Sequence, residues 1–225
     1  NKNHFEENVI KSDLLTFDYS KQRINQKVLD YLLQIPDLIN LKESLSLLFK
    51  GEVKNPSEGR TVSHTLYRDR ISSDNSELIF SERKKIQSFL NQRHSDHSFK
   101  NLICLSIGGS RLGPEFLNQF QSLDGPMKIY FCSSYDLHEL KDALRACQQK
   151  ETLVFASSKS FKTSEILKNL DYVKSWFAQK PDLILEDHLY GISANSSAMT
   201  SHGIKETNQF LLQDSLGGRF SIWSS

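Results

Sequence analysis

Leu102-Ile103-Cys104-Leu105, a short apolar run, leads directly into Ser106-Ile107-Gly108-Gly109-Ser110-Arg111-Leu112-Gly113. A second run, Leu153-Val154-Phe155-Ala156, leads in the same way into Ser157-Ser158-Lys159-Ser160-Phe161-Lys162-Thr163. A strand end followed by small residues, hydroxyls and a helix start forms an anion site, because backbone N–H and side-chain O–H groups converge there. Two such loops facing each other predict a site for a phosphorylated small molecule.

The second half of the chain alternates short apolar runs with helical stretches. This alternation is typical of a mostly parallel sheet with helices on both faces, whose ligands bind at the carboxyl ends of the strands. The sequence therefore predicts an α/β fold, a three-layer α-β-α sandwich around a five-stranded, mostly parallel sheet. The expected strands are 102–105, 129–132, 153–156, 189–192 and 210–212. One expected helix begins at Pro114, and three others span 137–147, 164–178 and 196–202.

The first half has a different pattern. Residues 1–22 are polar and weakly patterned, which predicts an arm. Apolar residues recur at helical spacing over residues 24–50. Pro36 is expected to separate two helices there, because proline removes a helix hydrogen bond and restricts the residue before it. Gly51 is expected to close the second helix.

Turn-forming residues fill the stretch 55–60, after which residues 61–67 are expected to begin a further helix. Ser81 is a plausible cap for a helix over residues 82–92. The domain prediction is an N-terminal helical arm over residues 1–98 and an α/β domain with the phosphate loops over residues 99–225.

Composition excludes several classes of function. The chain has 225 residues, of which 38% are apolar and 24% charged, and its net charge of +1 gives no electrostatic case for nucleic acid or an acidic membrane. The apolar runs are far shorter than a bilayer span. The three cysteines have no metal-ligand spacing and are expected to be reduced thiols, which fits a cytoplasmic protein. The ends at Asn1 and Ser225 suggest the N-terminal part of a longer protein.

The glycine loop allows two further interpretations. A tight strand-to-helix turn explains its glycines about as well as a ligand does. A dinucleotide site is the main rival, with the fingerprint G-x-G-x-x-G and an acidic residue after the second strand. Gly108, Gly109 and Gly113 read G-G-x-x-x-G, which breaks that fingerprint. Asp136 does lie near the end of the second strand, so spacing alone leaves the rival open.

The Ser157–Thr163 loop favours a monophosphate. Lys159 is a compact cation suited to phosphate, and hydroxyls surround it. On its own, such a cluster is usually a capped helix start. Its position at the carboxyl end of a second strand is what favours the phosphate interpretation. Lys162 is expected to point to solvent. Arg219, in a glycine turn beside aromatic residues, is either an oxyanion-stabilising group or a surface arginine.

Three segments resemble, in order, the N-terminal signatures of the glucose-6-phosphate isomerase family. They are IGGSRLGP (107–114), SSKSFKTSE (157–165) and GGRFSIWS (217–224). Weaker matches are EGRTVSHTLYR (58–68), FCSSYD (131–136), GISANSS (191–197) and NQFLLQDSLGGR (208–219). The resemblance covers roughly residues 20–225, and it implies the sugar-isomerase (SIS) domain with its five-stranded parallel sheet.

The resemblance also implies a reaction, the interconversion of glucose 6-phosphate and fructose 6-phosphate through an enediolate, without a metal or cofactor and in a homodimer. By the same resemblance, Arg219 would stabilise the enediolate, and Gly109 and Ser110 would border the sugar phosphate. The phosphate loop would consist of Ser158, Lys159, Ser160 and Thr163.

This sequence departs from the family pattern at several positions. Ser106 replaces a common glycine, Arg111 follows the serine where an acidic residue is usual, and Ser160 and Lys162 replace threonines. We expect Arg111 to be solvated. The family's catalytic glutamate, ring-opening histidine and further lysine lie beyond the GGR signature. This chain is therefore expected to bind sugar phosphate weakly at best and not to turn it over, since proton transfer needs a positioned base. A non-catalytic, sugar-phosphate-binding regulatory module is the alternative.

Overall fold

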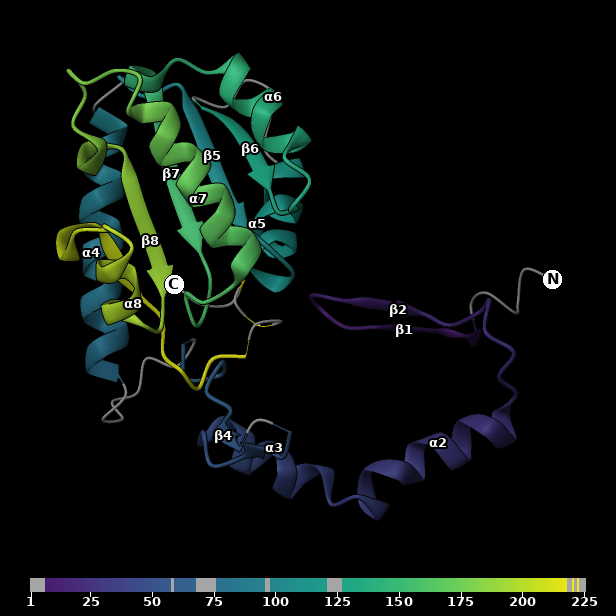
Figure 1. Ribbon diagram of the computed structural model, residues 1–225. Coiled ribbons are helices and arrows are strands. Elements are labelled where there is room, and N and C mark those ends of the chain that lie inside the picture. Colours follow the sequence, from purple (N-terminus) through teal and green to yellow (C-terminus); the bar gives the residue numbers. More distant parts are fainter. Residues whose placement is uncertain are drawn as a thin grey trace. The chain divides into compact units, whose positions relative to one another are not determined.

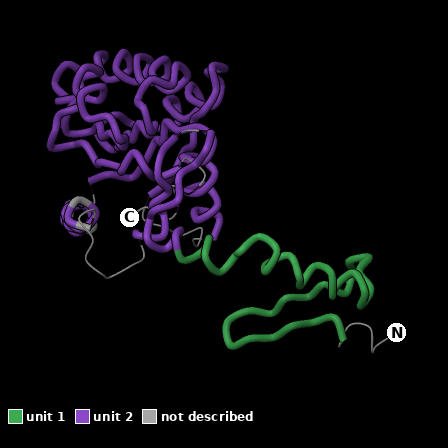
Figure 2. Tube along the Cα trace, turned by 90° about the horizontal axis from the view of Figure 1, so that it is seen from below, with its two compact units in different colours: residues 1–46 green, residues 47–225 purple. Residues whose placement is uncertain are grey.

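The computed structural model describes residues 7–57, 59–67, 76–95, 98–120, 127–217, 220 and 222. The chain divides into two compact units, Asn1–Ser46 and Leu47–Ser225 (Figure 2). The expected domain boundary at residue 98 stays a prediction. Within the described residues, no helix has the length and apolar character needed to cross a membrane.

The first unit begins with a β-hairpin where the sequence predicted only an arm. Strand β1 (Val9–Lys11) pairs antiparallel with β2 (Thr16–Asp18), so that Ile10 faces Phe17 across the pair. Hydrogen bonds between Ser12 and Leu15 close the connecting turn. These strands have three residues each, which is too short for alternation to be visible in the sequence.

Two helices follow, but Pro36 does not separate them. Helix α2 (Gln26–Leu38) contains Pro36 in its last turn, and α3 is Leu41–Phe49. The break falls at Asn40, whose φ of 49° is in the left-handed region that asparagine tolerates at a helix end. Gly51, with φ of 71°, closes the second helix as predicted: its N–H donates to Leu48 O over 3.0 Å.

The second unit opens with a small hairpin of β3 (Lys54–Asn55) and β4 (Arg60–Thr61). Turns over residues 64–67 replace the helix expected at 61–67. Helix α4 (Ser76–Ser95) starts before Ser81, which therefore lies inside the helix rather than capping it. Glu77 in the first turn provides the negative charge that favours this earlier start.

A five-stranded parallel sheet forms the centre of the second unit, as predicted (Figure 1). Its spatial order is β6-β5-β7-β8-β9, and every neighbouring pair is parallel. The strands are β5 (Asn101–Ser106), β6 (Lys128–Cys132), β7 (Thr152–Ser157), β8 (Leu189–Ser193) and β9 (Gln209–Leu211). Short 3-10 turns precede the last three strands, at Gln149–Glu151, Leu185–Asp187 and Glu206–Asn208.

Helices cover both faces of the sheet, which confirms the three-layer prediction. Helices α6 (His138–Ala146), α7 (Ser164–Phe177) and α8 (Ser196–Ser201) enclose a core that includes Ile103 and Val154, both fully buried. On the opposite face α4 packs against aromatic side chains of the sheet such as Phe155 and Phe210. Figure 1 shows α7 in front of the sheet and α4 behind it.

Helix α5 (Gly109–Gln119) starts at the glycines rather than at Pro114, which lies inside it. Gly108 precedes the helix with φ of 59°, a conformation that glycine adopts at no steric cost. Its carbonyl accepts from Leu112 N over 2.9 Å and so closes the first turn. The helix therefore begins directly at the end of β5, and the glycine loop is shorter than the sequence suggested.

The strand order contains one switch point. From β5 the chain moves outward to β6, then crosses back to β7 on the other side of β5. Ser106 and Ser157 end these two neighbouring strands and lie opposite each other in the register. In open α/β sheets the crevice at such a point is where ligands bind. The loops after β5 and β7 are the two hydroxyl-rich loops of the sequence.

Candidate functional site

The loop after β7 lines a cavity of about 470 Å³. The structure thus brings together all four residues predicted for a phosphate loop. The lining residues from this loop are Ser158, Lys159, Ser160 and Thr163, together with Lys162. Lys162 was expected to point to solvent. Other segments contribute Arg60, Ala194, Asn195 and Asp214.

Phe161 gives this loop its shape. Its ring is 1% exposed, and its φ of 51° is left-handed, which is rare for a bulky residue. Phe161 N donates to Ser158 O over 3.1 Å and closes a tight turn. The Ser158 and Thr163 hydroxyls lie 2.8 Å apart. A buried aromatic anchor therefore holds the backbone so that the polar side chains on both sides of it line one cavity.

Helix α7 starts at this cavity. The alternative interpretation of the loop, a capped helix start, requires a side-chain cap, which the described residues do not provide. Thr163 is the N-cap residue, yet no hydrogen bond from the described residues joins its side chain to the first N–H groups of the helix. Its hydroxyl pairs with Ser158 instead. The first N–H groups of α7 and the positive end of its dipole are thus available to an anion.

The loop after β8 supports the phosphate loop from beside it. Ser193 Oγ donates to Lys159 O over 2.9 Å, and Ala194 N donates to the same carbonyl over 3.0 Å. Asn195 caps α8 by accepting from Ala198 N over 3.1 Å, and its Nδ2 donates to Ser160 O over 3.3 Å. The carboxyl end of β8 therefore fixes the backbone that presents Lys159 and Ser160.

Arg60 and Asp214 line the side of the cavity formed by distant segments. Arg60 lies on β4, and Asp214 follows β9. Arg60 Nη1 lies 2.7 Å from Asp214 Oδ1. Our reasoning from the sequence assigned no role to Arg60, Asp214 or Asn195. Asn195 has a detectable signal, because it follows an expected strand whose carboxyl end neighbours that of β7. The signal for Arg60 is its place in the EGRTVSHTLYR segment (58–68), which resembles the family pattern.

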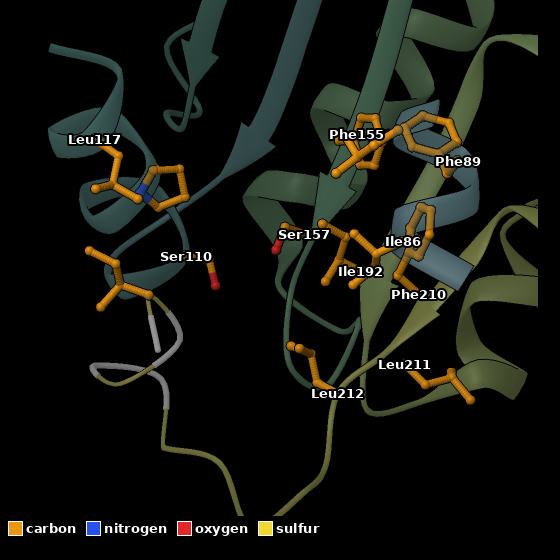
Figure 3. A pocket seen from close by; sticks show the side chains of 13 residues that line it. Ile86, Phe89, Ser110, Leu117, Phe155, Ser157, Ile192, Phe210, Leu211 and Leu212 are labelled. Carbon is orange, nitrogen blue, oxygen red and sulfur yellow. The ribbon is translucent and has the colours of Figure 1, made fainter. Parts of the chain in front are cut away.

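A second cavity, of about 430 Å³, lies against the other face of the sheet, between α4 and α5 (Figure 3). Its lining is mostly apolar, and the hydroxyls of Ser110 and Ser157 point into it from two sides. Ser110 lines this cavity together with Ser157, the last residue of β7, and Gly109 lines neither of these two cavities. The apolar lining consists of Ile86, Phe89, Leu90, Pro114, Leu117, Phe155, Ile192, Phe210, Leu211, Leu212 and Ile222.

Arg111 is bound to carboxylates, so the expectation that it is solvated was wrong. Its Nε lies 2.9 Å from Glu115 Oε2, and its Nη1 lies 3.1 Å from Glu139 Oε2. Hydrogen bonding to Glu115 raises the pKa of Arg111. Asp136 has a structural role as well: its Oδ1 accepts from His138 N over 3.2 Å at the start of α6. The carboxylate that a dinucleotide site requires is thus hydrogen-bonded to the backbone two residues on, just ahead of α6, whose N-cap is Leu137.

Arg219 lies outside the described residues, as do Gly218 and Trp223. The described neighbours on this segment are in contact with the rest of the unit. Phe220 stacks on His64 with ring centroids 4.2 Å apart, and Ile222 lines the apolar cavity. His64 itself lies in a turn and not in the expected helix.

The cysteines are free, as predicted. Cys132 and Cys147 are buried, and Cys104 is partly buried. Burial raises the pKa of Cys104 and of Cys132 to about 12. Among the residues that the structure describes, no group of three or more His, Cys, Asp or Glu side chains could hold a metal ion.

Comparisons with known proteins agree with this geometry. The family model described as "Phosphoglucose isomerase" matches residues 18–225. Curated relatives include glucose-6-phosphate isomerases of Pseudomonas putida, 32% identical over 94% of this chain, and of Paraburkholderia phymatum, 33% identical over 94%. The chain spans 41% of the length of each of these relatives.

Solved structures show the same likeness. A crystal structure of a glucose-6-phosphate isomerase from Chlamydia trachomatis matches 98% of this chain with a TM-score of 0.83 and 25% sequence identity, and the match covers 45% of that protein. A hypothetical protein from Thermus thermophilus has the same fold over 87% of the chain, with a TM-score of 0.61 and 21% identity. With the matched family model covering all but its first residues, this chain belongs to the phosphoglucose isomerase family.

Proposed function

We propose that this chain supplies the phosphate-binding part of an enzyme that interconverts glucose 6-phosphate and fructose 6-phosphate. One observation carries the proposal: hydroxyls, cations and a helix start converge on a single cavity at the carboxyl ends of the neighbouring strands β7 and β8. Family membership names the substrates. Because the chain spans about two fifths of its curated relatives, the activity is proposed for a protein of their length.

In this proposal the phosphate binds in the cavity beside α7. Lys159 acts as a point charge, and the hydroxyls of Ser158, Ser160 and Thr163 donate to phosphate oxygens. The start of α7 adds backbone N–H donors and a favourable dipole. The Ser158 and Thr163 hydroxyls lie 2.8 Å apart, close enough for both to reach one phosphate group.

The sugar and the reaction involve further residues. We propose that Gly109 and Ser110 border the sugar and that Arg219 stabilises the negative charge of the enediolate. Moving a proton between adjacent carbons also needs a general base, and none of the residues given a role here is one. The isolated chain is therefore expected to bind the sugar phosphate and to leave it unconverted.

Isothermal titration tests the proposal directly. Fructose 6-phosphate should bind this chain, fructose should not, and Lys159→Met should weaken binding of the phosphorylated sugar about tenfold or more, because a charged donor is lost. NAD serves as the competing ligand. Tight binding of NAD together with no binding of fructose 6-phosphate would overturn the proposal in favour of a dinucleotide site.

A coupled isomerase assay tests whether the catalytic base lies outside this chain. The isolated chain should show no conversion, whereas a protein that extends to the length of the relatives should convert both sugars. Activity in the isolated chain would show that its base lies within these 225 residues. A cytoplasmic location and a homodimer belong to the same proposal, and the mass of the extended protein in solution tests the latter.

A further inference from the structure

Arg60 is one of the residues lining the phosphate cavity to which the proposed function gives no role. It lies on the β3–β4 hairpin, almost one hundred positions before the phosphate loop in the sequence, and still lines the same cavity as Lys159. Its side chain is 47% exposed, so it is neither part of the core nor fully solvated. Its position calls for an explanation in terms of the cavity.

The hairpin is held firmly enough to place this side chain. Asn55 Oδ1 accepts from Ser57 N over 3.0 Å and stabilises the turn, and Val62 N donates to Val53 O over 2.8 Å. After the hairpin, the Ser63 hydroxyl lies 2.7 Å from that of Ser215. Arg60 is therefore presented by backbone that is anchored at the turn and at its exit.

The loop that carries Asp214 is anchored to the same segment. Gln213 N donates to the hydroxyl of Tyr67 over 3.2 Å, and Tyr67 is 3% exposed. Tyr67 packs with Leu216 and Ile79 in a small core. The Arg60–Asp214 pair thus joins two segments that buried contacts already hold together, and the fold does not depend on the pair.

The charges of the cavity suit a phosphate. Arg60, Lys159 and Lys162 face one carboxylate, Asp214, which leaves an excess of two positive charges. A phosphate monoester carries about −1.5 to −2 at neutral pH. Without Arg60 the excess falls to one. An arginine also has five N–H donors in a planar fork, and the pair with Asp214 uses Nη1, so other nitrogens can donate to an anion.

We propose that Arg60 is a specificity-determining residue that binds the phosphate directly, and that Asp214 positions its guanidinium. This inference rests on the proposed function, since it concerns the same cavity. Arg60 and the start of α7 line the same cavity, so that the phosphate contacts both a helix start and an arginine fork. Binding at this edge favours a terminal phosphate dianion over a singly charged carboxylate.

Substitutions at these two residues distinguish a ligand contact from a structural contact. Arg60→Met removes the donor, and it should weaken binding of fructose 6-phosphate and inorganic phosphate to the whole chain about tenfold. Asp214→Asn keeps an oxygen that can accept from Nη1 while removing a negative charge from the cavity, so it should strengthen binding severalfold. If Arg60 serves only to hold Asp214, then Asp214→Ala, which breaks the same contact, should weaken binding as much as Arg60→Met does, and that result would overturn the proposal.

Controls separate this inference from the proposed function. Lys159→Met must weaken binding for the cavity to be the phosphate site. If Lys159→Met weakens binding and Arg60→Met does not, only the role of Arg60 is wrong. If neither does, both proposals fail. Circular dichroism confirms folding of each variant, and Arg60→Lys, which keeps the charge but lacks the fork, should lose about threefold and serves where Arg60→Met does not fold.

Discussion

At Phe161 a buried ring holds the backbone in a conformation that L-residues adopt at a cost of about 1–2 kcal/mol. Burial of the ring, which is 1% exposed, offsets that cost. No sequence pattern predicts this arrangement, because Phe161 lies among polar residues and resembles an exposed loop position. Its role depends on core contacts that only the folded chain provides.

Substitution of Phe161 tests this account. Phe161→Ala should lower the free energy of unfolding by about 3–5 kcal/mol through loss of packing. Phe161→Gly should cost about 1 kcal/mol less than Phe161→Ala, because glycine adopts positive φ without strain. Urea unfolding of the two variants measures the difference. A more stable alanine variant would show that the left-handed conformation is not retained.

Cys132 provides a second test at the scale of a residue. Burial raises its pKa to about 12 in the folded state, well above the ordinary value of a cysteine thiol. Its contribution to stability is complete below pH 9 and is lost as the pH rises toward 12, because the unfolded thiol ionises first. Cys132→Ala should therefore flatten the fall in unfolding free energy between pH 9 and pH 11.

Thiol labelling checks the same point independently. At pH 8 a disulfide reagent should react slowly with the folded chain and rapidly with all three cysteines in guanidinium. Rapid labelling of folded Cys132 would contradict the burial that the structure assigns to it.

At the scale of elements, the start of α8 serves both the fold and the cavity. Asn195 caps this helix and also lines the phosphate cavity. Asn195→Asp keeps an oxygen able to cap but loses the Nδ2 donor to Ser160 O, so the fold should lose about 1 kcal/mol of stability. The added negative charge should weaken binding of fructose 6-phosphate about tenfold.

Asn195→Ala is the matched control for that prediction. It removes the cap and should cost about 1 kcal/mol of stability, measured by urea unfolding. Its effect on sugar phosphate binding should be smaller than that of Asn195→Asp, since no charge is added. The reverse order would mean that Asn195 acts on the ligand through the cap alone.

The comparison of sequence and structure is also clearest at this scale. All five sheet strands and helices α6 to α8 were predicted, because buried strands of parallel sheets are short continuous apolar runs. The predicted helix boundaries were wrong where local backbone geometry decides the boundary, as at Gly108 and Asn40. The phosphate loop was found from its residue types, whereas Arg60 comes from a distant hairpin that no local pattern connects to it.

At the scale of the whole molecule, the sheet and its helices belong to the second unit alone. Helices α2 and α3 have no buried residues. Deleting residues 1–46 should therefore change the melting temperature of the remaining chain by less than about 3 °C. Differential scanning calorimetry of both chains measures this, and a larger loss would show that the first unit supports the second.

Ser157 and Ser158 are consecutive, yet one faces the apolar cavity and the other the phosphate cavity. The end of β7 is therefore the partition between two compartments, the apolar cavity and the charged phosphate cavity. Because neighbouring side chains point to opposite faces of a strand, any displacement of this partition alters both compartments together. Phosphate affinity and the shape of the apolar compartment are consequently not independent traits, and a change selected for one is transmitted to the other.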